Sequence, residues 1–175
     1  MLDIVSQIIK YYLETSKIPT KNELVIKDKS LLEKKGTIFI TIYKSGNIVG
    51  NSGNIVEIEN DLVNELIKNT IFALGDKRFE RLTINDLDKI KIRIDILKNR
   101  ILLNDKKIQD LNPVKSGILV IKKDYNKLSV ILPNISSTMT SGDDFVEVLS
   151  NKLEEEFKAE NYIVYEIQTE VLTNY

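Results

Sequence analysis

The chain has 175 residues, of which 42% are hydrophobic and 29% charged, and its formal net charge is −1. This length is typical of one domain with a sizeable core. The sequence contains no histidine and no cysteine, which excludes imidazole bases, thiolate nucleophiles, disulfides, iron–sulfur clusters and thiolate zinc sites. Catalysis would have to use acidic, lysine, tyrosine or hydroxyl groups, and we expect neither a metal site nor a cofactor.

The first third of the chain predicts a helix followed by a strand. Apolar residues recur at helical spacing over residues 2–16, which predicts an amphipathic helix, and Pro19 ends it. The lysine-rich residues 17–35 contain at most a short helical turn. The β-branched run at residues 37–43 predicts a strand, and a turn at residues 45–47 follows it.

The middle of the chain predicts a second helix. Asn60 is its expected N-cap, and Gly75 is placed to end it. A capping box formed by Thr83 and Asp86 then predicts a short helix at residues 84–88.

Residues 90–96 alternate isoleucine with polar side chains, which predicts a half-buried strand. Lys91, Arg93 and Asp95 occupy the polar face of this strand. We interpret that face as exposed to solvent.

The last third predicts a β-hairpin at residues 117–132, with its turn at residues 124–126. A second capping box, Ser141 with Asp144, begins a helix whose inward residues run from Phe145 to Phe157. A final strand covers residues 162–172.

Helices and hairpins therefore alternate without regular βαβ units. This order predicts an α+β fold with packed helices on a mostly antiparallel or mixed β-sheet. We expect a single domain over residues 1–175, with two lobes possible and most of the sheet within residues 36–135.

Charge is distributed unevenly along the chain. Residues 77–107 carry a net charge of +5 and residues 141–175 a net charge of −7. These segments form either two solvated faces or a basic groove and an electrostatically steered contact. Nucleic-acid binding is disfavoured, because the sequence pI is about 5.7 and the aromatic residue nearest to Lys91 and Arg93 is Phe79.

The N-terminal residues lack the basic region of a signal peptide. No apolar run approaches the roughly 18 residues that a bilayer-spanning helix requires. We therefore expect a cytoplasmic protein without a membrane segment.

Two segments carry candidate site residues. Gly50, Asn51, Ser52 and Gly53 are expected in a loop between a strand and a helix, where backbone N–H groups can bind an anion. The glycines alternatively serve a turn or bulge. Asp76 and Arg78 follow the second helix and either project into one cleft or pair across the turn. In a cleft, Arg78 would clamp a phosphate or carboxylate.

Several short segments, taken in order, resemble the AMMECR family. The resemblance covers the chain from about Gly36 to Gln168 and implies an α+β fold of two lobes. Family members occur beside, or fused to, Memo-like and radical-SAM proteins, which makes these the expected partners by association. The family has no settled activity. The matching segments are residues 36–41, 48–53, 76–79, 82–83, 90–97, 117–120, 131–133 and 165–169, together with the helix led by Phe145.

The sequence departs from the family's most distinctive motif, Leu-Arg-Gly-Cys-Ile-Gly. Both glycines are present as Gly50 and Gly53, but Val49 replaces the arginine and Asn51 replaces the cysteine. The Asp-Pro-Arg-Phe motif is kept except for Lys77 in place of proline. We interpret the chain as a non-catalytic or vestigial-site protein that binds a ligand or partner. The alternative is an enzyme that acts on a small anionic substrate through Asp76, Arg78 and the Gly50–Gly53 segment.

Overall fold

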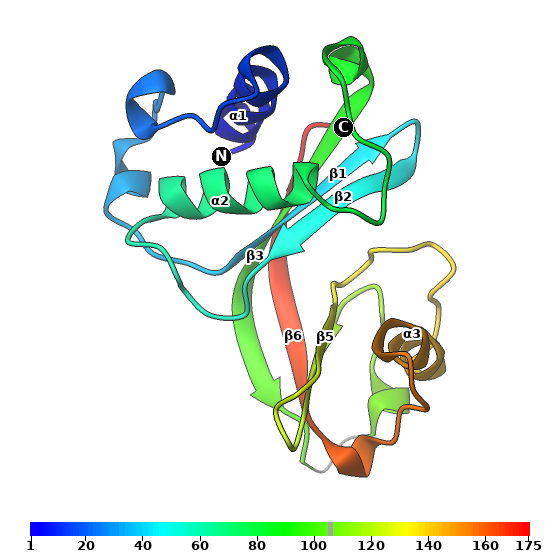
Figure 1. The fold of residues 1–175 in the computed structure, drawn as a ribbon. Coiled ribbons are helices and arrows are strands. Elements are labelled where there is room, and N and C mark those ends of the chain that lie inside the picture. The colour runs from blue at the N-terminus through cyan, green and yellow to red at the C-terminus, as the bar shows by residue number, and fades with distance from the viewer. Residues whose placement is uncertain (105–106) are drawn as a thin grey trace. The chain divides into compact units, whose positions relative to one another are not determined.

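A computed structural model describes residues 1–104 and 107–175 of the chain (Figure 1). The described residues form helices and strands whose hydrogen-bonded strand order is β2-β1-β3-β6-β4-β5. The α-helices are α1 (Leu2–Thr15), α2 (Leu62–Leu74) and α3 (Asp143–Leu153). The strands are β1 (Ile38–Lys44), β2 (Asn47–Gly53), β3 (Ile90–Leu102), β4 (Gly117–Lys122), β5 (Leu128–Ile131) and β6 (Tyr162–Thr173). The predicted α+β class is confirmed.

The chain divides into two compact units. Unit 1 comprises Met1–Ile96 and Val171–Tyr175, and unit 2 comprises Leu97–Glu170. Short 3₁₀-helices connect the longer elements within each unit. They are η1 (Lys21–Glu23), η2 (Lys29–Leu32), η3 (Ile84–Lys89), η4 (Ile108–Asp110) and η5 (Ala159–Asn161). None of the helices in residues 1–104 and 107–175 is long and apolar enough to cross a bilayer.

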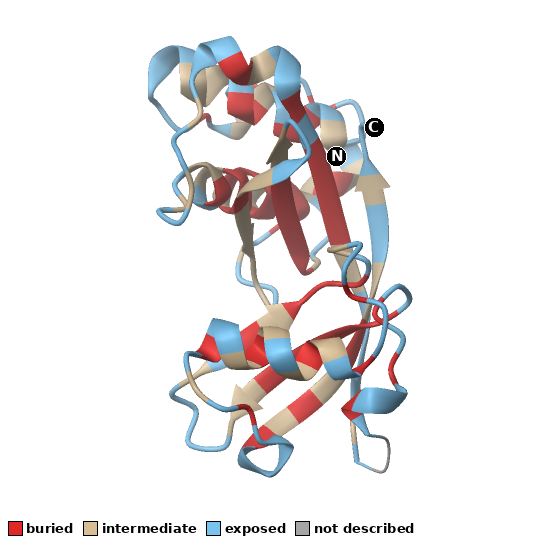
Figure 2. Cartoon of the chain, turned by 90° about the vertical axis from the view of Figure 1, so that its right-hand side faces the viewer, coloured by how far each residue is buried: buried red, intermediate tan, exposed pale blue. Residues whose placement is uncertain are grey.

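Unit 1 is built on the β1–β2 hairpin, which is antiparallel, and β1 also pairs antiparallel with β3. The hairpin turn has positive φ at Ser45 and Gly46, the backbone that tight two-residue hairpin turns require. Alternate β1 residues, including Ile38 and Ile40, form a core with α1 and α2. In Figure 1, α2 lies across β1 and β2, and Figure 2 shows buried positions along the strands and the inner helix faces.

Local predictions for β2, for the N-cap of α2 and for the end of β3 are wrong. The segment from Gly50 to Gly53 belongs to strand β2 rather than to a loop. The N-cap of α2 is Asp61 rather than Asn60, because the Asp61 carboxylate accepts a hydrogen bond from Asn64 N at 3.0 Å. Strand β3 continues to Leu102, beyond the predicted end at residue 96.

Unit 2 contains the predicted β4–β5 hairpin, and β4 also pairs antiparallel with β6. The predicted capping box is only half formed at the start of α3. The Asp144 carboxylate accepts hydrogen bonds from Thr140 N at 2.7 Å and Ser141 N at 2.8 Å, but the N-cap is Gly142 rather than Ser141, without a side-chain capping bond. Glu154, with φ of 54°, ends the helix. Phe157 therefore lies beyond the helix, yet it is buried in the unit 2 core beside Phe145.

Candidate functional site

The Gly50–Gly53 segment of β2 lies against the C-terminal end of α2. A Cβ atom at Gly50 would lie 2.2 Å from the carbonyl oxygen of Ala73, so a residue with a side chain does not fit without displacing backbone. A Cβ atom at Gly53 would lie 2.1 Å from the Phe39 ring. Both glycines therefore permit close packing within unit 1.

The Asp76 carboxylate connects the end of α2 to strand β2. It accepts a hydrogen bond from Asn51 N at 3.3 Å, and β2 is an edge strand of the sheet. The carboxylate also accepts from Arg78 N, Nε and Nη2 at 3.2, 2.9 and 2.6 Å. Asp76 thus supplies an acceptor for an N–H group of the edge strand, which has no further strand on its outer side.

Asp76 and Arg78 therefore form the ion pair that was one of the two sequence-based alternatives. The Arg78 hydrogen bonds hold the pKa of the Asp76 carboxyl below its usual range, against the opposing effect of burial. The Asp76 side chain is 9% exposed, whereas that of Arg78 is 61% exposed. The Arg78 guanidinium lies 5.4 Å from the centre of the Phe79 ring. The pair consequently presents a fixed cation at the surface and an enclosed carboxylate beneath it.

The polar side chains of the Gly50–Gly53 segment make hydrogen bonds within unit 1. Asn51 Nδ2 donates to Thr41 Oγ1 at 2.8 Å. Ser52 Oγ donates to Asn69 Oδ1 on α2 at 3.3 Å. The two side chains lie on opposite faces of β2, as the alternation along a strand requires.

Sequence reasoning missed a buried polar cluster centred on Glu65. The Glu65 carboxylate accepts hydrogen bonds from Asn54 Nδ2 and Asn69 Nδ2, each at 3.0 Å, and from Ile58 N and Glu59 N at 2.7 and 2.8 Å. These bonds fix the segment between β2 and α2. The available signal was the spacing of Glu65 and Asn69, which places two polar residues one above the other on a helix face.

A second polar group lies on β3, where the predicted solvent-exposed face is wrong for two of its three residues. Lys91 is exposed, but the residue exposure is 4% for Arg93 and 0% for Asp95. Arg93 Nε and Nη2 donate to the two Asp95 oxygens at 2.7 and 2.8 Å. Burial acts to lower the pKa of Arg93, but the Asp95 hydrogen bonds and charge outweigh it and raise that pKa. Neutralisation within the pair allows both faces of the strand to be buried.

Thr41 lies between Asn51 of the Gly50–Gly53 segment and Arg93 of the buried ion pair. In the strand register, Thr41 pairs with Asn51 on β2 and with Arg93 on β3. A polar row thus crosses three strands of unit 1, on the face opposite the isoleucines of the core. Among the described residues, no group of three or more acidic side chains is arranged to hold a metal ion.

The fold and this site define an α+β protein in which the C-terminal end of a helix is fixed by a carboxylate to a glycine-containing edge strand. The sequence matches the AMMECR1 family over residues 2–171, and the chain belongs to that family.

One sequence relative and one solved structure are also similar to the chain. Protein CA_C1420 of Clostridium acetobutylicum is 25% identical over 141 residues, which are 78% of this chain and 29% of that protein. The chain therefore spans less than a third of the length of this relative. The uncharacterized protein PH0010 from Pyrococcus horikoshii has the same fold, with a TM-score of 0.81 over 97% of this chain and 87% of that one, at 20% identity.

Proposed function

We propose that this AMMECR1-family protein is a non-catalytic binding protein, in which Arg78 and the adjacent edge of β2 contact an anionic ligand or partner. The observation that carries the proposal is the use of the Asp76 carboxylate. Its oxygens receive hydrogen bonds from Asn51 N and from the backbone and guanidinium of Arg78. The carboxylate is engaged in holding the site together, and the exposed arginine is oriented for contact.

The charge state of Asp76 argues against proton transfer at this site. A general acid or base works best when its pKa lies near the working pH, but the pKa of Asp76 is lowered by Arg78. Asn51 stands at the cysteine position of the family motif, and its amide is not a nucleophile. Asp76 accepts from Nε and Nη2 of Arg78, so a carboxylate or phosphate group would accept from the Nη1 end of the exposed guanidinium.

A titration of ¹⁵N-labelled protein followed by NMR tests the binding role, with inorganic phosphate and a tetraglutamate peptide as probes. We expect chemical-shift changes centred on Arg78 and Phe79 that disappear in Arg78→Gln. Arg81→Gln is the matched control, since Arg81 is also exposed and lies three residues away. Equal responses of the two variants, or no response to either probe, would contradict the proposal.

Partner binding is supported by the Clostridium relative, in which the matching segment is 29% of a longer protein. In that relative, the matching segment is joined to further polypeptide, which it can contact within the same chain. We therefore retain Memo-like and radical-SAM proteins as proposed partners, and the cytoplasm as the proposed location. Sedimentation of the chain mixed with a purified Memo-like or radical-SAM protein from the same genome tests this. We expect a complex that Arg78→Glu weakens.

The second candidate is an enzyme that acts on a small anionic substrate, with Arg78 binding the anion and Asp76 transferring a proton. The hydrogen bond from Asn51 N to Asp76 favours this candidate, because it brings the two predicted segments together. A turnover screen with phosphate and carboxylate esters tests this candidate. Catalysis by Asp76 predicts that Asp76→Asn abolishes any activity found, whereas the binding role predicts no activity that depends on this carboxylate.

A further inference from the structure

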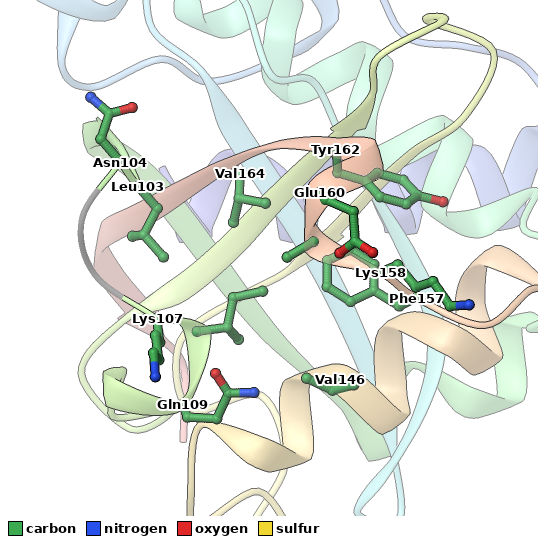
Figure 3. Close-up of a pocket in the computed structure, with 12 residues that line it drawn as sticks. Leu103, Asn104, Lys107, Gln109, Val146, Phe157, Lys158, Glu160, Tyr162 and Val164 are labelled. Atoms are coloured by element: carbon green, nitrogen blue, oxygen red, sulfur yellow. The ribbon is translucent and has the colours of Figure 1, made fainter.

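A cavity of 520 Å³ lies within unit 2 (Figure 3). It forms where η4 and the residues just after β3 meet α3 and the segment that leads into β6. Its volume falls in the range of about 300–1,000 Å³ that small-molecule sites occupy. None of its lining residues belongs to the Asp76–Arg78 site in unit 1, so the cavity is a separate feature of the chain.

The floor of the cavity is apolar and is held in place by the fold. Buried Ile108, Phe157 and Val164 line it. Leu103 N donates to the Val164 carbonyl oxygen at 2.8 Å, and Phe157 N donates to Ser150 Oγ at 3.0 Å. These bonds fix two walls of the cavity before any ligand enters, which reduces the entropy lost on binding.

The rim of the cavity carries charges of both signs. Lys107 and Gln109 lie on one side of the apolar floor and Glu160 on the other (Figure 3). Lys158 also lines the rim, but its ammonium already pairs with Glu156 at 3.1 Å. Within residues 1–104 and 107–175, no ion pair engages the side chain of Lys107 or of Glu160. Among the described rim residues, Lys107 and Glu160 therefore offer a cationic and an anionic contact across an apolar surface.

We propose that this cavity binds a small zwitterion with an apolar body, of the amino-acid or dipeptide class. The ligand carboxylate contacts the Lys107 ammonium and the Gln109 amide, and the ligand ammonium contacts the Glu160 carboxylate. The apolar side chain of the ligand covers Phe157 and Val164. A purely anionic ligand would meet Glu160, and a purely cationic ligand would meet Lys107, so each would face a like charge.

Calorimetry with three matched peptides tests this assignment. The probes are L-leucyl-L-phenylalanine, its C-terminal amide, which lacks the carboxylate, and its N-acetyl derivative, which lacks the ammonium. We expect the free dipeptide to bind and each derivative to bind about tenfold more weakly, since each loses one charge-assisted contact. Absence of dipeptide binding at millimolar concentration, or equal binding of the three peptides, overturns the proposal.

Variants of the rim locate the site. Lys107→Gln is expected to lower the affinity for the free dipeptide about tenfold, so that the dipeptide and its C-terminal amide bind equally well. Glu160→Gln is expected to make the affinities for the free dipeptide and for its N-acetyl derivative equal. Lys158→Gln is the matched control and should leave affinity within about twofold, because this lysine already has a partner. All three residues are exposed, so unchanged melting temperatures are expected, and equal weakening by Lys158→Gln and Lys107→Gln refutes the assignment.

Discussion

The two units use their polar side chains differently. In unit 1, the buried Glu65 accepts four hydrogen bonds and the buried Arg93 and Asp95 pair with each other. In unit 2, the rim of the cavity carries charged groups, Lys107 and Glu160, that face solvent. Polar residues inside unit 1 thus stabilise its fold, whereas those around the unit 2 cavity are available to a ligand. The buried polar residues of unit 1 therefore differ from the exposed Arg78, Lys107 and Glu160, which are the residues proposed to bind.

The largest expected effect comes from breaking the buried pair of unit 1. Arg93→Met removes the guanidinium from Asp95, and leaving a buried carboxylate without its ion-pair partner costs about 3 kcal/mol of unfolding free energy. The double variant Arg93→Met with Asp95→Leu removes both charges and should recover most of that loss. Urea denaturation followed by circular dichroism measures both. A single variant as stable as the wild type would show that the pair is not needed for folding.

A smaller effect is expected from the close contact between α2 and β2. Gly50→Ala places a Cβ atom 2.2 Å from the Ala73 carbonyl oxygen, and relieving this overlap should cost about 2 kcal/mol of unfolding free energy. Gly75→Ala is the control, since its Cβ atom would lie no nearer than 3.4 Å to its neighbours and its effect should stay within about 0.5 kcal/mol. Equal melting temperatures for the two variants would mean that β2 and α2 do not require this contact.

The smallest expected effect concerns stability in acid. Each unit contains a carboxylate whose pKa is lowered by its hydrogen bonds. Hydrogen bonds from the Lys44 ammonium and Thr83 N lower the pKa of Asp86 in unit 1 to about 2. Hydrogen bonds from Lys127, Tyr162 and Lys122 lower the pKa of Glu155 in unit 2 to about 2. Both groups bind protons more weakly in the folded chain, so their stabilisation is complete above about pH 4.5 and is lost as the pH falls toward about 2.

Asp86→Asn and Glu155→Gln should therefore flatten the decline of unfolding free energy between those pH values. The exposed Asp88→Asn and Glu156→Gln serve as controls and should leave the decline as it is in the wild type. Urea denaturation at a series of pH values measures the slope for each variant. Unchanged slopes in Asp86→Asn and Glu155→Gln would show that these carboxylates do not carry the acid sensitivity.

Local patterns predicted most of the elements because helical spacing, strand alternation and capping residues act over short distances. The same patterns failed for β2, whose Gly-Asn-Ser-Gly composition has low strand propensity. Its pairing with β1 and its contact with Asp76, 25 residues away, depend on the tertiary fold. The burial of Arg93 and Asp95 also escaped prediction, although two opposite charges at alternate strand positions were a usable signal.

The candidate site was predictable only in part. Proximity in sequence correctly suggested that Asp76 and Arg78 would pair. One of the two hypotheses placed Asp76 together with the Gly50–Gly53 segment, but the hydrogen bond from Asn51 N to the Asp76 carboxylate was not predictable, because that contact requires the close approach of α2 to Gly50. The unit 2 cavity was likewise not predictable from the sequence, because its lining residues come from separate segments that share no motif.

The most direct test of the central claim is a ¹³C NMR titration of the Asp76 carboxylate in the folded protein. The binding role of the site predicts a pKa for Asp76 below its usual range, because Arg78 stabilises the ionised form. It also predicts that Arg78→Gln moves this pKa upward. A pKa for Asp76 near neutrality would contradict the account, since it would leave the carboxylate able to exchange a proton with a substrate at the pH of the cell.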